Sequence, residues 1–187
     1  DEASDTYDTV DWLLHHVKGN DGRVGIAGSS YPGFYAMMGG LSGHPAVKAI
    51  VPQAPVTDWF MGDDFHHNGA LFLRDAFSFH PSNSRIRRQP TQSMPPVPIY
   101  NHTDEYSFFL GQRCLSNLSR LLGDTIPFWN DMMNHPNYDA WWKARDLRSG
   151  CLNVKPAVLV VGGLFDAEDY FGACQLYQAI RSKSTLT

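Results

Sequence analysis

The sequence has few cysteines, few charged residues and no long apolar run, and each shortage excludes a class of protein. The three cysteines, Cys114, Cys151 and Cys174, are odd in number and form no CxxC pair, which argues against a disulfide framework and a structural zinc site. No apolar run approaches the roughly 20 residues that cross a bilayer, so no membrane partner is expected. Charged residues make up only 18% of the chain, so part of the surface is expected to be covered by something else.

An excess of positive charge is also missing. The formal net charge of −4 at pH 7 gives no reason to expect a nucleic acid or an anionic membrane as partner. The one basic cluster, Arg85, Arg87 and Arg88, stands in a Pro/Ser-rich stretch and is interpreted as a solvated loop. Hydrophobic residues make up 43% of the 187 residues, enough for one domain with a core.

What the chain does contain is three short apolar runs, each of which predicts a buried strand. Residues 24–27 (VGIA) follow one predicted helix, in which Val10, Leu13, Leu14 and Val17 recur at helical spacing, and precede another over 34–41. Residues 46–58 predict a second strand that runs into a loop. Residues 155–163 (KPAVLVVGG) predict a third, followed by a helix over 167–180. This order favours the α/β class, with a parallel sheet and helices on its faces.

Between the second and third strands the sequence is irregular and rich in proline and aromatic residues. A helical stretch is predicted there with Phe108, Leu115, Leu118 and Leu122 on one face. We therefore predict three parts. Residues 1–62 form the first part of the core, residues 63–150 a mostly helical cap insertion, and residues 151–187 the return to the core.

The stretch RVGIAGSSYPGF places two serines between a predicted strand and a predicted helix. Such a turn projects one side chain beyond the sheet and brings the next backbone N–H to the place where an oxyanion would form. Gly28 and Gly33 flank Ser30 at the spacing that this turn requires, whereas the matching positions around Ser29 are an alanine and a proline. Ser30 is therefore the candidate nucleophile, with the Tyr31 N–H as oxyanion donor.

The segment GSSYPG resembles the turn of the cocaine-esterase and X-Pro-dipeptidyl-peptidase family of α/β-hydrolases, most closely its α-amino acid ester hydrolase branch, which includes proteins named glutaryl-cephalosporin acylases. Three further segments match in order and spacing: HPAVKAIVPQAPVTDWFMGDD, HPNYDAWWKARDL and VGGLFDAEDYFGA. The resemblance implies a partial α/β-hydrolase core of about three parallel strands with a helical cap. It also implies a serine hydrolase that needs no metal and no organic cofactor.

The same resemblance assigns four acidic residues. Asp166 takes the place of the triad acid, which orients the catalytic imidazole. Asp64, Glu168 and Asp169 take the places of a carboxylate cluster that holds a substrate's α-ammonium group. Carboxylates brought together raise one another's pKa unless a cation neutralises them, so such a cluster suits an ammonium group. The expected substrate is a small α-amino acyl ester or amide, or a short peptide.

The triad also needs a general base, and none of the eight histidines follows Asp166 in the sequence. The resemblance places the histidine beyond Thr187 and a second oxyanion donor, a tyrosine, before Asp1. We therefore expect an internal piece of an enzyme that hydrolyses little alone. Its open sheet edges are expected to favour a homo-oligomer. The resemblance slightly favours a periplasmic or secreted location.

Two alternatives remain open at this stage. The segment GDDFHHNG carries two acids and two histidines that suggest a metal hydrolase, although neighbouring histidines point apart on regular structure. The other alternative is a binding or interaction module that retains a degenerate hydrolase core without catalysis.

Overall fold

The structure is a computed structural model that describes residues 1–87, 89–90, 92–93 and 104–184. Arg88 of the basic cluster lies outside these residues. The elements follow in the order α1 (Glu2–His16), β1 (Val24–Ser29), α2 (Tyr31–Leu41), β2 (Val47–Gln53), β3 (His66–His67), β4 (Ala70–Leu71), α3 (Leu73–Asn83), α4 (Glu105–Gln112), α5 (Leu115–Leu122), η1 (Gly123–Thr125), α6 (Pro127–Asn134), α7 (Ala140–Lys143), η2 (Leu147–Gly150), β5 (Ala157–Val158) and α8 (Tyr170–Lys183). Within the described ranges, no helix has the length and apolar character needed to cross a membrane.

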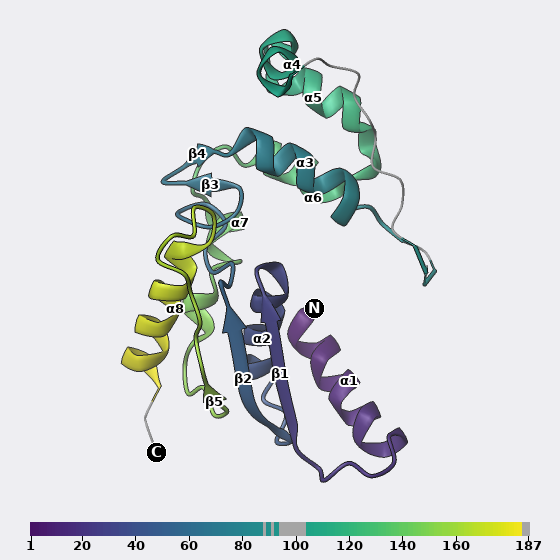
Figure 1. The fold of residues 1–187 in the computed structure, drawn as a ribbon, viewed down its shortest axis with the longest axis vertical. Helices are drawn as coiled ribbons and strands as arrows, with labels where there is room; N and C mark the ends of the chain where they lie inside the picture. Colours follow the sequence, from purple (N-terminus) through teal and green to yellow (C-terminus); the bar gives the residue numbers. More distant parts are fainter. Residues whose placement is uncertain (88, 91, 94–103, 185–187) are drawn as a thin grey trace. The chain divides into compact units, whose positions relative to one another are not determined.

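Three strands form a parallel sheet, as the sequence predicts, and their order in the sheet is β1-β2-β5 (Figure 1). Ile26 of β1 pairs with Ile50 of β2, which in turn pairs with Val158 of β5. At the carboxyl end of the sheet, Ser29 pairs with Gln53, and a further bridge joins Gln53 to Val161. Because parallel strands end at one edge, the segments after β1, β2 and β5 meet at the same edge of the sheet.

Helix α2 packs against β1 and β2, and helix α1 packs against α2. The residues buried between these elements are apolar and include Met37 and Ala36 of α2 and Ile50 of β2, all fully buried. Of the apolar face predicted for α1, Val10 is buried and Leu13 and Leu14 are half-buried, whereas Val17 lies past the end of the helix and is 45% exposed. The packed core therefore fixes the end of β1 and the start of α2, where the candidate nucleophile lies.

The third strand is shorter and more exposed than predicted. Regular pairing covers only residues 157–158, and isolated backbone hydrogen bonds continue it, from Leu159 N to Ile50 O and from Val161 N to Pro52 O. Leu159 is 60% exposed and Val161 is 40% exposed, so the prediction of a buried strand is wrong for its outward face. Periodicity cannot distinguish a strand buried on both faces from one buried on a single face when every residue is apolar. The homo-oligomer expected from the sheet edges stays a prediction.

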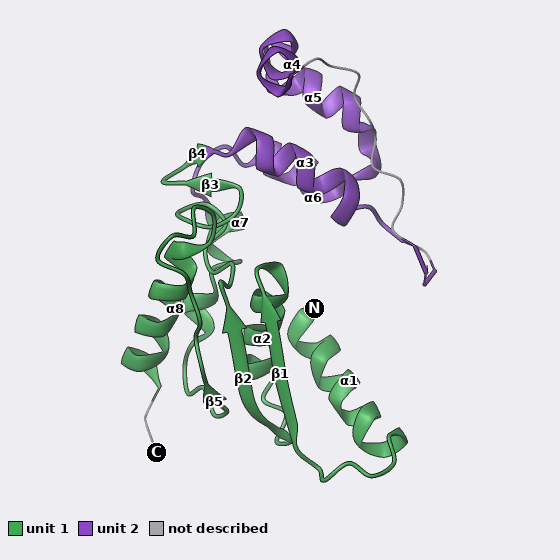
Figure 2. Ribbon diagram, viewed as in Figure 1, with its two compact units in different colours: residues 1–70, 140–187 green, residues 71–139 purple. Residues whose placement is uncertain are grey.

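The chain divides into two compact units, residues 1–70 with 140–187 and residues 71–139 (Figure 2). In the second unit, Trp129, Leu118 and Met132 are buried, and Phe77 meets Trp129 edge-on at 5.9 Å between ring centroids. The helical stretch predicted around residues 108–122 is two helices, because Arg113, with φ of 64°, breaks it between α4 and α5. The three-part domain division drawn from the sequence stays a prediction.

Candidate active site

Ser30 occupies the turn between β1 and α2. Its backbone has φ 62° and ψ −125°, a conformation that costs a residue other than glycine about 1–3 kcal/mol. Three backbone hydrogen bonds hold it there: Ser30 N donates to Gln53 O over 2.9 Å, and Ser30 O accepts Gly33 N over 2.8 Å and Phe34 N over 3.2 Å. Ser29, by contrast, is the last residue of β1. The residue at the sharp bend is therefore Ser30, the serine chosen from the sequence.

The two glycines around Ser30 are required because the backbone passes too close for a side chain. A Cβ built on Gly28 would stand 2.1 Å from Pro32 O, and one on Gly33 would stand 2.6 Å from Gln53 O. Both distances are shorter than any real contact between these atoms, and the obstacle in each case is backbone. The turn can therefore exist only with glycine at both positions.

Replacing Gly28 with alanine is expected to destabilise the fold by about 3 kcal/mol, because the new methyl group displaces the first turn of α2. Gly25, in the same strand, is the matched control, since its Cβ would meet nothing nearer than Ala49 O at 3.9 Å. Urea unfolding of the two alanine variants measures the difference. Equal stabilities would contradict the crowding at the turn.

Two of the predicted acidic residues lie beside Ser30. The Ser30 hydroxyl donates to Asp169 Oδ2 over 3.2 Å, and the Asp64 backbone N–H donates to Asp169 Oδ1 over 3.1 Å. Asp64 is 5% exposed and Asp169 is 3% exposed. The structure thus brings together three residues, Ser30 after β1, Asp64 after β2 and Asp169 after β5, that are far apart in the sequence.

Asp166 and Glu168 lie on the loop that leads into α8. Asp166 Oδ1 accepts the backbone N–H groups of Glu168 at 2.9 Å and of Asp169 at 3.0 Å, so Asp166 fixes the turn that carries both residues. Among the described residues, the Ser30 hydroxyl donates to Asp169 and not to Asp166. Glu168 is exposed. Its backbone carbonyl oxygen lies 3.1 Å from Nε2 of His67.

Tyr31 is the first residue of α2. The first N–H groups of a helix point out of its N-terminal end, where a negative charge is stabilised. The tyrosine ring meets Trp59 edge-on, with centroids 5.6 Å apart, and burial raises the pKa of its hydroxyl. Tyr31 therefore lies at the N-terminal end of α2, and the oxyanion role of its N–H stays a prediction.

Burial dominates the electrostatics of Asp64 and Asp169, called the acidic pair below. It raises the pKa of Asp64 to about 9, helped by the nearby charges of Asp169 and Glu168. Burial also raises the pKa of Asp169, against the hydrogen bonds that Asp64 and Ser30 donate to it. At pH 7 the Asp64 carboxyl is therefore protonated, and the pair carries a proton that a cation in the site would displace.

Replacing Asp64 with asparagine is expected to remove a loss of stability at high pH. Folding raises the pKa of Asp64 from 3.8 to about 9. The contribution of its bound proton to the free energy of unfolding is therefore complete below the pKa of the unfolded state and is lost as the pH rises through the pKa of the folded state. Between pH 7.5 and 9.5 this group lowers the free energy of unfolding by about 2 kcal/mol.

Urea unfolding of the native chain and the Asp64→Asn variant at both pH values measures this contribution. His66 and His80, whose pKa values burial lowers, are neutral in both states in this range and do not interfere. If the free energy of unfolding fell by the same amount between pH 7.5 and 9.5 in the two proteins, Asp64 would not be the group that holds the proton.

Sequence reasoning missed the role of a further buried carboxylate, Asp63. Its Oδ2 accepts the backbone N–H groups of Thr57 and Asp58, both at 2.9 Å, and its Oδ1 accepts that of Gly172 at 2.6 Å. Burial raises the pKa of Asp63 to about 7 although these three bonds lower it. The sequence GDD gives no reason to assign different roles to Asp63 and Asp64. A hydrogen bond between residues 109 positions apart leaves no local pattern in the sequence.

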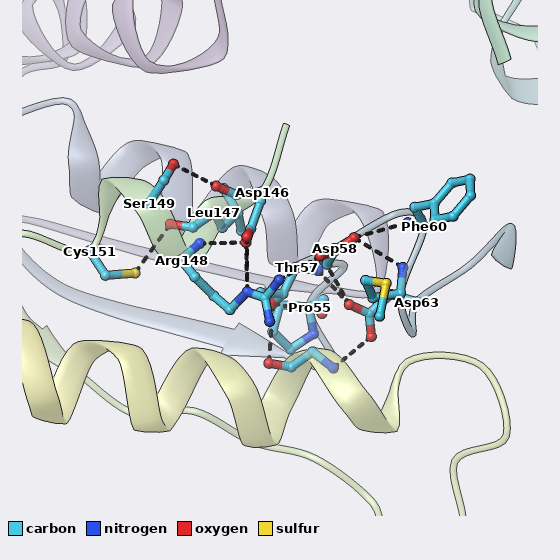
Figure 3. A network of polar contacts seen from close by, with 12 residues as sticks. Pro55, Thr57, Asp58, Phe60, Asp63, Asp146, Leu147, Arg148, Ser149 and Cys151 are labelled. Carbon is cyan, nitrogen blue, oxygen red and sulfur yellow. Dashed lines mark hydrogen bonds and ion pairs between the residues drawn. The ribbon is translucent and has the colours of Figure 1, made fainter. Parts of the chain in front are cut away.

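Beside this carboxylate stands an ion-pair network, also missed from the sequence (Figure 3). The Arg148 guanidinium donates from Nη2 to Asp58 Oδ2 and from Nε to Asp146 Oδ1. Asp58 Oδ1 accepts the N–H groups of Phe60 and Met61. The network fixes the loop after β2 to the segment that precedes β5.

The two histidines of GDDFHHNG are directed to separate backbone carbonyls. His66 Nδ1 lies 3.2 Å from Trp59 O, and His67 Nε2 lies near Glu168 O. Across the part of the chain that the structure describes, no group of three His, Cys, Asp or Glu side chains is arranged to hold a metal ion. The segment thus supplies Asp64 to the site around Ser30.

Two curated relatives are hydrolases. Cocaine esterase from Rhodococcus sp. (strain MB1 Bresler) is 25% identical over 175 residues, which cover 89% of this chain and 30% of the esterase. Xaa-Pro dipeptidyl-peptidase from Ligilactobacillus salivarius is 24% identical over 149 residues, which cover 79% of this chain and 16% of the peptidase. The chain therefore spans less than a third of the length of either protein.

Solved structures resemble the chain over nearly all of its length. An α-amino acid ester hydrolase is 32% identical with a TM-score of 0.85, over 97% of this chain and 29% of that one. An aminopeptidase from the marine sediment archaeon Thaumarchaeota archaeon is 31% identical with a TM-score of 0.86, over 97% of this chain and 30% of that one. These neighbours confirm the predicted α/β-hydrolase core. Residues 1–187 match the family described as X-Pro dipeptidyl-peptidase (S15 family), and the chain belongs to this family of hydrolases.

Proposed function

We propose that this chain carries the nucleophile and the substrate-binding acids of a serine hydrolase that cleaves ester or amide bonds of α-amino acyl substrates. The observation that carries the proposal is the hydrogen bond from Ser30, held in a strained turn, to Asp169, whose other oxygen accepts the Asp64 N–H. The Ser30 hydroxyl and a buried acidic pair thus lie side by side.

In the proposed reaction the Ser30 oxygen attacks the carbonyl carbon of the substrate and forms a C–O bond. The hydroxyl proton passes to an imidazole, which Asp166 orients, and the Tyr31 N–H stabilises the oxyanion. Collapse of the intermediate expels the leaving group, which takes the proton from the imidazole. Water then cleaves the acyl-enzyme by the same steps in reverse.

The imidazole is proposed to come from a segment outside the 187 residues, because all eight histidines precede Asp166. The relatives, of which this chain covers 30% or less, are long enough to supply it. Measurements of catalysis therefore belong to the natural polypeptide that contains these residues, called the full-length protein below. The isolated chain is expected to hydrolyse little.

The acidic pair is proposed to bind the α-ammonium group of the substrate, with Glu168 as a third carboxylate. Two buried carboxyls that share a proton are neutralised equally well by a cation, and a primary ammonium donates three hydrogen bonds. A metal would also be a cation, but within the described residues no group of three His, Cys, Asp or Glu side chains is arranged to hold one. An ammonium ligand needs no such ligand set.

The acyl preference of the full-length protein tests this assignment. An α-amino acyl ester is expected to react with a kcat/KM at least about tenfold higher than that of the same ester without the amino group, since a buried charge pair contributes more than 1 kcal/mol. A glutaryl amide, whose acyl group carries a negative charge, is expected to react more slowly still. Faster cleavage of the glutaryl amide would contradict the role of the three carboxylates.

A further inference from the structure

The carboxylate of Asp63 joins two segments that are distant in the sequence. One is the loop after β2, where Asp63 Oδ2 accepts the N–H groups of Thr57 and Asp58. The other is the first turn of α8, where Asp63 Oδ1 accepts the N–H of Gly172 over 2.6 Å. Asp63 itself is fully buried, so water does not compete for these bonds.

The same two segments are held in a second way. The carbonyl of Gly172 accepts the hydroxyl of Thr57 over 3.1 Å, so both backbone groups of this glycine are bound by the loop after β2. A Cβ on Gly172 would stand 2.0 Å from Pro55 O and 2.8 Å from Asp63 Oδ1. The backbones therefore approach as closely as a glycine allows.

The two segments joined in this way carry the acidic pair. Asp64 follows Asp63 directly, in a left-handed conformation with φ of 49°, and Asp169 lies three residues before Gly172. We propose that Asp63 is a positioning residue that fixes Asp64 against Asp169, and so sets the preference of the site for substrates with an α-ammonium group. The inference rests on the proposed ammonium-binding role of the pair.

A carboxylate suits this position better than an amide does. All three partners of Asp63 are backbone N–H groups, and a carboxylate presents acceptors only. Asparagine has nearly the same size, but its NH₂ group would face an N–H donor in either orientation. The substitution therefore leaves one donor unsatisfied and loosens one of the two segments, while removing little volume.

Asp58 offers a matched control on the same loop. It is buried to the same degree as Asp63, and its carboxylate also accepts backbone N–H groups, those of Phe60 and Met61. Its other oxygen accepts a hydrogen bond from Arg148, whose guanidinium carbon stands 5.5 Å from the ring centroid of Phe171 in α8. The Asp58→Asn variant therefore weakens the fold but leaves in place the hydrogen bonds of Asp63 and Thr57 to Gly172.

The test measures kcat/KM of the full-length protein for an α-amino acyl ester and for the same ester without its amino group. Asp63→Asn is expected to lower the ratio of the two values by about tenfold, through a higher KM for the amino ester, because a displaced binding group loses its geometry. Asp58→Asn is expected to leave the ratio within about twofold of the native value. Thermal unfolding of each variant shows that the protein measured is folded.

The possible results separate the two proposals. A native ratio near one would overturn the ammonium site, and with it this inference. A high native ratio that Asp63→Asn leaves unchanged, or that Asp58→Asn lowers equally, would overturn the positioning role alone. If Asp63→Asn does not fold, Thr57→Val removes the hydroxyl that donates to Gly172 O over 3.1 Å and lies 3.4 Å from Pro55 O in its own loop. It is expected to lower the ratio by about threefold, and an unchanged ratio would again overturn the positioning role.

Discussion

Replacing Ser30 with alanine is expected to lower kcat/KM of the full-length protein for an α-amino acyl ester by about 10,000-fold or more. The variant loses the oxygen that is proposed to form the acyl-enzyme, at the residue that occupies the bend between β1 and α2. The fold is expected to survive, because alanine keeps the backbone bonds to Gln53 and Gly33. Steady-state kinetics and thermal unfolding measure the two effects.

Ser29 provides the control for this substitution. It is the neighbouring residue and carries the same side chain, but it ends β1 in the regular pairing with Gln53. Ser29→Ala is expected to change kcat/KM by less than about threefold. If Ser29→Ala abolished hydrolysis and Ser30→Ala did not, the choice between the two serines would be wrong.

Replacing Asp166 with asparagine is expected to lower kcat by about 10,000-fold, with a much smaller change in KM. The carboxylate would hold the imidazole in the reactive tautomer and stabilise its charged form, and an amide does neither. Asp166 Oδ1 accepts two backbone N–H groups, which the amide oxygen can still accept. The loop is therefore expected to keep its shape.

Asp146 makes the same local contact as Asp166 and serves as its control. In each case one carboxylate oxygen accepts the backbone N–H of the second residue along the chain over 2.9 Å. Asp146→Asn also loses part of the ion pair with Arg148, so it is expected to destabilise the fold more and to reduce kcat much less. Comparable losses of kcat in the two variants would indicate that Asp166 has only a structural role.

Much of the fold follows from local pattern. The three strands, their parallel arrangement and the helices α1, α2 and α8 are evident from short apolar runs joined to helical periodicity. The exposed face of the third strand is not evident, because Leu159 and Val161 are as apolar as a buried strand would require. The break at Arg113 also escapes prediction, since a left-handed residue other than glycine has no clear pattern.

For the candidate site, residues at turns with a known sequence pattern can be predicted from the sequence. Residues whose partners are far away in the sequence cannot. Ser30 stands out because Gly28 and Gly33 flank it at a spacing that the crowding explains. Asp63 does not, because its three partners are backbone groups, which any sequence supplies. The proximity of Asp64 to Asp169 followed only from the family resemblance, and the structure provides the contact that links them.

The most direct test of the central claim, that Ser30 is the nucleophile, is covalent labelling of the full-length protein with a fluorophosphonate, followed by mass spectrometry of the peptide that contains both serines. The account predicts one label, on the Ser30 oxygen, at a rate that falls when an α-amino acyl ester competes, and no label on the Ser30→Ala variant. A label on Ser29, or no label on a folded and intact protein, would contradict it and would favour a binding module without catalysis.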